Sequence, residues 1–333
     1  MPPALALPLF LVSLVVTLAA ARLFARRLDR LGIRFGLAEA AVGLLTALAA
    51  DGPEISAALV AVAKGAHNVG VGVIVGSNIF NLAAMIGLSA IIAGSVRLPR
   101  ETLWLEGLTG SAATLLAVAV LLGWIPAVPA ILALACVLIP YVALIARGPR
   151  LLSRLPLAGG LAGGLGRALG DRQPRSRARV AFPDPTHHLV GLIVLDVGLI
   201  VAGSTGMVQS ALTLSDHWQI SRPVLGVLIL APLTSIPNAI TAWRLGVARR
   251  GSALVSETFN SNTLNLAAGV TAPALFVSLA GLSGTEKAGL GWLIAMTAVS
   301  LLLLGPAKGM RRPGALVVLS LYLGFVAFQL ASA

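Results

Sequence analysis

Residues 49–81, AADGPEISAALVAVAKGAHNVGVGVIVGSNIFN, place acidic and amide side chains inside sequence that is otherwise apolar enough to cross a membrane. Asp51 and Glu54 flank Gly52 and Pro53. Because proline lacks the backbone donor of a helix, the Gly-Pro pair predicts a local break that leaves carbonyl oxygens beside two carboxylates. Charged groups at that depth are costly, so the stretch predicts a cation site.

The same stretch ends in the hexapeptide GSNIFN, residues 76–81. Ser77 and Asn81 are four residues apart and therefore share one face of a helix. Two facing helices would then offer carboxylate, hydroxyl, amide and backbone oxygens to one ion. The alternative is that these side chains only form hydrogen bonds between spans, as small polar residues commonly do in membranes.

An altered copy of this pattern lies 184 residues downstream, at residues 233–265, LTSIPNAITAWRLGVARRGSALVSETFNSNTLN. The two stretches align without gaps, and Pro237 falls on Pro53. The alignment also places Asn238 on Glu54, Ser261 on Ser77 and Asn265 on Asn81. Internal repeats with Gly/Pro-interrupted apolar segments are typical of secondary transporters, whose substrate site lies near the membrane midplane where the repeats meet.

Composition indicates an integral membrane protein, because hydrophobic residues make up 57% of the chain and charged residues only 11%. The net charge of +12 would suggest nucleic acid as the partner of a soluble protein, but the positions of the basic residues indicate membrane orientation instead. The single cysteine, Cys136, excludes an intramolecular disulfide.

The apolar runs predict an all-α membrane protein of about ten spans in two five-helix repeats. The expected spans are approximately 5–21, 39–64, 69–81, 103–122, 127–146, 189–212, 224–248, 253–279, 290–304 and 316–330. The repeats would occupy residues 1–146 and 187–333, with motifs at 49–81 and 233–265. Residues 147–186 form a Gly-, Pro- and Arg-rich linker, expected to face anionic lipid headgroups rather than nucleic acid.

Basic residues support a topology with both termini outside and the linker in the cytoplasm. All Lys and Arg residues except Lys64, Arg222 and Lys287 fall on the expected inner side. The first motif helix would then run outward and its counterpart inward, so the repeats are expected to be inverted. A prokaryotic plasma membrane is the expected location.

The run 49–54 with GSNIFN, and its echo 233–238 with NSNTLN at 260–265, resemble the two alpha repeats of the sodium/calcium exchanger, or calcium/cation antiporter, superfamily. In that family each repeat usually reads Gly-Thr-Ser-x-Pro-Glu, and glutamates, serines and the last residue of each GSNIFN-like element bind calcium or sodium. Matched position by position, the resemblance implies ion ligands at Glu54, Ser77, Asn81, Thr234, Ser235, Ser261 and Asn265.

Three departures from the family pattern extend this candidate set. Asp51 stands where the family has serine, Asn238 replaces the second glutamate, and Glu257 stands where the family often has asparagine. Either Asp51 or Glu257 is expected to offset the carboxylate missing at Asn238. Glu257 lies four residues before Ser261, on the same helical face, or alternatively is a solvated helix end.

Other polar residues have simpler interpretations. Asp196, inside the sixth expected span, either relays protons or pairs with another span. Four histidines, His67, His187, His188 and His217, are expected in loops, solvated and without metal-ligand spacing. The sequence contains no GxxxxGK[ST] motif, so no ATP-binding loop is expected.

The resemblance and the ligand types together predict a secondary antiporter, not an enzyme, that exchanges calcium for sodium or protons and needs no cofactor. Its partners would be membrane lipid and inorganic cations. Two alternatives stay open: a non-transporting protein that keeps the repeats only for packing, and a cation channel. Two carboxylates as close as Asp51 and Glu54 are not expected to stay ionised together without a cation, which favours protons as competitors of sodium.

Overall fold

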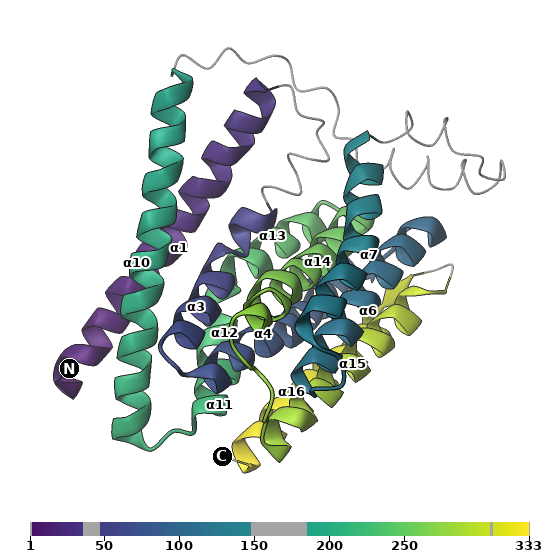
Figure 1. Ribbon diagram of the computed structural model, residues 1–333. Helices are drawn as coiled ribbons and strands as arrows, with labels where there is room; N and C mark the ends of the chain where they lie inside the picture. Colours follow the sequence, from purple (N-terminus) through teal and green to yellow (C-terminus); the bar gives the residue numbers. More distant parts are fainter. Residues whose placement is uncertain (1, 36–46, 148–184, 307–308, 333) are drawn as a thin grey trace.

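The computed structural model describes residues 2–35, 47–147, 185–306 and 309–332, and these are almost entirely helical (Figure 1). The first half contains α1 (Pro3–Arg34), α3 (Gly52–Ala63), α4 (His67–Asn81), η1 (Leu82–Leu88), α5 (Ser89–Ala93), α6 (Arg100–Leu121) and α7 (Ala127–Arg147). The second half contains α10 (Thr186–Trp218), α11 (Arg222–Val224), η2 (Leu225–Leu230), α12 (Ala231–Thr234), α13 (Ile236–Val247), α14 (Gly251–Leu266), η3 (Ala267–Thr271), η4 (Pro273–Leu275), α15 (Gly284–Leu304) and α16 (Arg312–Ala331).

The internal repeat of the sequence is also a repeat of helices. Helices α10, α13, α14, α15 and α16 begin within one residue of the positions 184 residues after the starts of α1, α3, α4, α6 and α7. The long helices α1 and α10 lie side by side and run in opposite directions (Figure 1). The offset of the motifs therefore extends over both halves of the chain.

Seven described helices are long and apolar enough to cross a membrane, and the bent pair 222–234 and 236–247 makes an eighth. Of the ten expected spans, the second is described only from residue 47, where it leads into the short apolar helix α3. The eighth corresponds to α14, a helix of 16 residues that carries Glu257 and several polar side chains. The membrane fold is confirmed, while the count of ten rests in part on these two shorter helices.

One small β element was not expected. Strands β1 (Ser95–Val96) and β2 (Met310–Arg311) form an antiparallel pair, with Ser95 opposite Arg311 and Val96 opposite Met310. The pair joins the loop before α6 to the loop before α16. It therefore ties the first repeat to the second at one end of the helix bundle.

The central helix α4 packs against η2 with almost no side chain between the two backbones. A Cβ atom on Gly76 would lie 2.7 Å from the Val227 carbonyl oxygen, and one on Gly226 would lie 2.6 Å from that of Val69. Real Cβ atoms do not approach other atoms so closely, so this crossing requires glycine. The contact brings the GSNIFN end of α4 next to the interrupted helix of the other repeat.

Gly76→Ala is therefore expected to destabilise the protein by about 1–3 kcal/mol, because the added methyl group must push two backbones apart. The matched control is Gly191→Ala on α10, where an added Cβ would meet nothing within 4 Å. That change removes a flexible helix residue and should be neutral or stabilise by up to about 1 kcal/mol. Unfolding midpoints in detergent measure both, and equal shifts in the two variants would contradict the tight crossing.

An ion pair joins the two long helices. The Arg27 guanidinium on α1 donates to the Asp196 carboxylate on α10 and, at 3.3 Å, to the Leu192 carbonyl oxygen. Asp196 is buried and Arg27 is 20% exposed. Asp196 was predicted either to relay protons or to pair with another span, and the structure shows the pairing.

We expect Asp196→Asn to lower stability by roughly 3 kcal/mol, because it leaves the partly buried Arg27 without its counter-charge. Replacing both partners with apolar residues, Arg27→Met with Asp196→Leu, should restore most of the loss because no buried charge then remains. Unfolding midpoints of the two variants provide the comparison. A double variant less stable than Asp196→Asn would contradict the explanation.

Candidate ion-binding site

Both motif helices are interrupted at equivalent positions. Asp51 occupies a turn between helical residues 47–50 and α3, and Ser235, its counterpart in the second repeat, separates α12 from α13. The axes of the two segments around Ser235 differ by 49°. Prolines in the first turns of α3 and α13 account for the breaks, because each lacks the backbone donor that would continue the preceding helix.

Helices α4 and α14 meet face to face through their GSNIFN-type elements. Asn78 Nδ2 donates to the Asn262 carbonyl oxygen, and Asn262 Nδ2 donates to that of Asn78, each at 3.1 Å. The two residues are 184 positions apart, so this reciprocal pair relates the repeats directly. Neither asparagine was among the predicted ion ligands, although their equivalent positions in the two motifs could have indicated them.

Asn238 connects the carboxylates of the first repeat to the second repeat. Its Nδ2 lies 2.8 Å from Asp51 Oδ1, 2.9 Å from Glu54 Oε1 and 3.1 Å from Ser261 Oγ. Ser261 Oγ donates to Asp51 Oδ1 at 2.6 Å, and Ser235 Oγ donates to Glu54 Oε1 at 3.1 Å. Each acid from one repeat is therefore held by donors from the other.

The two acids are buried without a compensating cationic side chain. Asp51 and Glu54 both have 0% exposure. Within the described part of the chain, neither carboxylate is paired with Lys or Arg. An ionised carboxylate left in that condition carries a large desolvation cost, so the site requires a cation or protons to neutralise it.

Five buried oxygen atoms of this cluster accept no hydrogen bond among the described residues. They are Asp51 Oδ2, Glu54 Oε2, Asn81 Oδ1, Asn238 Oδ1 and Asn265 Oδ1. Four of these oxygens belong to residues at equivalent positions of the two repeats, Glu54 with Asn238 and Asn81 with Asn265. Asp51 supplies the fifth. Carboxylate and amide oxygens are the ligands that hard cations prefer, so the donor set fits a cation shared by the two repeats.

The remaining nominated residues on these helices have identifiable partners. Asn81 Nδ2 donates to Ser261 Oγ at 3.1 Å and to Asn262 Oδ1 at 3.2 Å, while Asn265 Nδ2 donates to Asn78 Oδ1 at 3.3 Å. Ser77 Oγ lies 3.5 Å from the Ala231 carbonyl oxygen. Thr234 instead donates to its own preceding turn, at Leu230 and Ala231, so its proton is not offered to the cluster.

Glu257 is not part of the hydrogen-bonded cluster. It is half-buried on α14, one turn before Ser261, and makes no hydrogen bond or ion pair with any described residue. The structure thus brings nine of the ten nominated side chains into the buried core of the site region and leaves Glu257 beside it. The negative charge inside the cluster comes from the first repeat alone.

The four histidines lie in helix ends, which corrects the expectation of loops. His67 begins α4, His187 and His188 lie in the first turn of α10, and His217 lies at its last turn. The helices extend beyond the apolar runs from which their ends were predicted. Polar residues such as histidine can occupy these helix ends because the side chains reach water there. Among the described residues, no group of three or more His, Cys, Asp or Glu side chains is arranged to hold a metal ion.

Another buried acid, which the sequence-based prediction missed, lies next to the site. Glu106 of α6 is 1% exposed and accepts a hydrogen bond of 2.9 Å from the Tyr141 hydroxyl of α7. Tyr141 also contacts the Asn260 side chain on α14, adjacent to Ser261. The sequence could have indicated Glu106, because an acidic residue inside an apolar membrane span usually has a function.

The fold and the site define a class of protein: an integral membrane protein with a buried cluster of acids and amides between two interrupted helices related by an internal repeat, an arrangement typical of secondary transporters. The family model for sodium/calcium exchanger proteins matches residues 5–147 and 188–331. The chain belongs to this family, and it is a cation antiporter rather than an enzyme.

Individual relatives are more distant. The chain is 34% identical over 86 residues to "Putative antiporter CaxA" of Alkalimonas amylolytica, a match that spans 26% of this chain and 27% of that protein. The sodium-calcium exchanger NCX_Mj, crystals of which were soaked with Na+ and Sr2+, superposes with a TM-score of 0.61 at 17% identity over 98% of this chain and 99% of that one. Native YfkE superposes with a TM-score of 0.64 at 15% identity over 96% and 92%. At these identities the two structures show the shared fold.

Proposed function

We propose that this antiporter moves calcium across the membrane in exchange for sodium or protons, using the cluster around Asp51, Glu54 and Asn238 as its ion site. The observation that carries the proposal is a pair of fully buried carboxylates with no cationic partner in the described chain. One oxygen of each carboxylate and three neighbouring amide oxygens accept no hydrogen bond from the described residues. A transported cation bound between the two carboxylates would offset the cost of burying their charge.

Calcium suits this donor set in charge and in ligand type. The two carboxylates can balance one divalent cation, and amide, hydroxyl and backbone oxygens can complete a shell of about six to eight ligands. Magnesium demands a stricter octahedral shell and gives up its water reluctantly, so a buried set of protein oxygens suits it less well than calcium.

The distribution of charge supports protons as coupling or competing ions. Both acids belong to the first repeat, while the equivalent positions of the second repeat hold the neutral Ser235 and Asn238. When calcium leaves, the pair is neutralised either by protons on the carboxylates or by sodium. Both acids accept a hydrogen bond from the same Asn238 amide nitrogen, so they lie close together. Repulsion between two such close carboxylates favours a proton held by the pair.

Calcium flux into proteoliposomes under an imposed sodium or proton gradient tests the proposal. We expect uptake to depend on one of the two gradients and to stop when that gradient is dissipated. Absence of calcium movement under both gradients would contradict calcium antiport and leave the non-transporting alternative. Conductance without dependence on either counter-ion gradient would indicate a channel.

Transport is expected to weaken as pH falls on the side from which calcium enters. Protonation removes the negative charge that binds calcium, so a lower pH should raise the calcium concentration needed for half-maximal uptake. The measurement is initial calcium flux between about pH 6 and 8 at fixed sodium. Sodium-driven flux that is unchanged over this range would eliminate protons as competitors.

We further propose a plasma membrane location with both termini outside, inorganic cations and membrane lipid as partners, and no resident cofactor or nucleic acid. Cysteine placed at Ser153, which lies outside the described residues, should be labelled only from the cytoplasmic side. Labelling from the outside would reverse the proposed orientation.

A further inference from the structure

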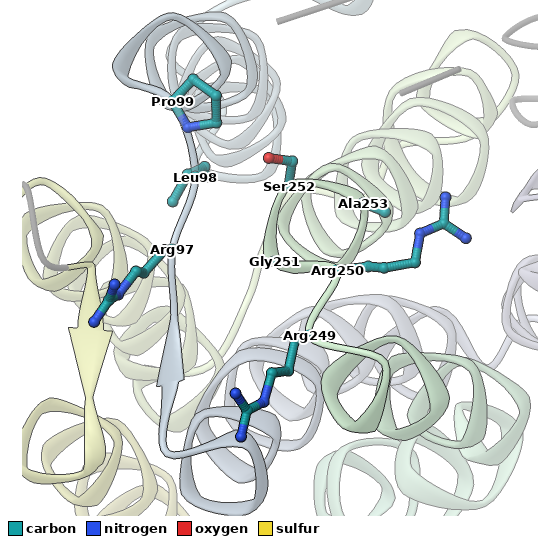
Figure 2. A pocket seen from close by; sticks show the side chains of 8 residues that line it. All are labelled: Arg97, Leu98, Pro99, Arg249, Arg250, Gly251, Ser252 and Ala253. Carbon is teal, nitrogen blue, oxygen red and sulfur yellow. The ribbon is translucent and has the colours of Figure 1, made fainter. Parts of the chain in front are cut away.

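A cavity of about 380 Å³ lies where the loop before α6 meets the turn between α13 and α14 (Figure 2). Its lining comes from both repeats: Arg97, Leu98 and Pro99 from the first, and Arg249, Arg250, Gly251, Ser252 and Ala253 from the second. The two walls are in close contact, because a Cβ atom on Gly251 would lie 2.2 Å from the Arg97 carbonyl oxygen. The cavity therefore lies where two segments from different repeats pack tightly against each other.

The rim of the cavity is strongly basic. Arg97, Arg249 and Arg250 are exposed and stand around its rim, with their guanidinium groups pointing outward (Figure 2). Within the described part of the chain none of the three forms an ion pair or a side-chain hydrogen bond, and no acidic residue is part of the lining. Three unpaired guanidinium groups offer many donors in a planar geometry that matches phosphate oxygens.

Two tryptophans place this rim at the level of the membrane surface. Trp104 lies one turn inside α6 and is 65% exposed, and Trp243 lies on α13, six residues before Arg249, and is 54% exposed. Exposed tryptophans on membrane helices are concentrated at the headgroup level. A phosphate that meets the three arginines at this depth belongs most naturally to a lipid.

We propose that this cavity is a binding site for a phosphate group, carried by the headgroup of an anionic phospholipid. The exposed arginine side chains are long enough to turn toward a phosphate at the rim. The lipid would bridge the first repeat to the turn that joins α13 to α14. Those two helices carry Asn238 and Ser261, so the bound lipid would steady the second-repeat half of the ion site. Lipid binding itself does not depend on which ion is transported.

The test uses the purified protein in detergent, with the unfolding midpoint and native mass spectrometry as readouts. Phosphatidylglycerol, phosphatidylcholine and inorganic phosphate are added separately. The site variant is Arg97→Gln with Arg249→Gln and Arg250→Gln. Its matched control is Arg22→Gln with Arg26→Gln and Arg244→Gln, three exposed arginines that do not line the cavity.

Phosphatidylglycerol should stabilise the wild type and the control more than phosphatidylcholine does, and its affinity should fall by roughly fivefold for each cavity arginine removed. Inorganic phosphate that stabilises the wild type equally and displaces the lipid would assign the same site to free phosphate, whereas no effect of phosphate would assign it to the headgroup. Equal losses in the site and control variants, or no preference of the wild type for phosphatidylglycerol, would overturn the proposal.

Discussion

Asp51→Asn is expected to reduce calcium transport by roughly a hundredfold or more while making the ion-free protein more stable. Asp51 supplies one of two buried carboxylates, and losing a buried charged partner of a cation costs several kcal/mol of binding. In the ion-free protein no metal cation offsets that buried charge, and only the uptake of a proton neutralises it, so its removal relieves a desolvation cost. Opposite effects on transport and stability distinguish an ion ligand from a packing residue.

Two measurements check this result. Calcium flux in proteoliposomes reports transport, and the unfolding midpoint with and without calcium reports binding. Asp196→Asn is the matched control, because it neutralises another buried acid in the same way but breaks the ion pair with Arg27. It should lower stability and leave the calcium-induced shift in place. Wild-type flux in Asp51→Asn, or an undiminished calcium-induced shift, would remove Asp51 from the ion site.

Asn238→Glu is expected to destabilise the ion-free protein strongly, and adding Asp51→Ser should reverse the effect. The Asn238 amide lies 2.8 Å from Asp51 and 2.9 Å from Glu54, so glutamate there would place a third carboxylate against two others. Like charges about 4 Å apart repel by about 4 kcal/mol at an effective dielectric constant of 20. The double variant again has two acids, now one in each repeat.

The double variant also tests what determines the coupling ion. With Glu54 and a glutamate at position 238 it has the motif pattern usual in the family, and we expect sodium to replace protons as the driving ion. Flux measured against pH and sodium in the wild type, Asn238→Glu and the double variant provides the comparison. Equal stability of the single and double variants would contradict the charge argument. Unaltered ion preference would show that these two positions do not determine it.

Much of the architecture could be predicted from local sequence. Apolar runs identified the spans, and prolines at positions 53 and 237 identified the interruptions, because chain geometry forbids a regular helix there. The equal spacing of two motifs predicted a repeat that the helices follow over both halves. Residues 36–46 and 148–184, the latter nearly the whole linker, lie outside the described residues, so the predictions made there stay predictions.

The site shows where local pattern stops being informative. Asn78 and Asn262 stand in motifs that were recognised, yet their reciprocal hydrogen bonds depend on how α4 crosses α14. Glu257 shares a helical face with Ser261, but the structure leaves it half-buried beside the cluster. Helical spacing determines which residues share a face, and only packing determines what that face meets.

The sequence by itself determined that this is a membrane protein with two related halves and that acids and amides lie within its spans. Those properties follow from composition and from the positions of prolines, charges and repeats along one chain. Only the tertiary structure decided that Asn238 joins Asp51 to Glu54 and that Asp196 belongs to Arg27 instead of the site. Each of these contacts joins residues more than 160 positions apart, and such partners are selected by the close packing of helices, which no local pattern encodes.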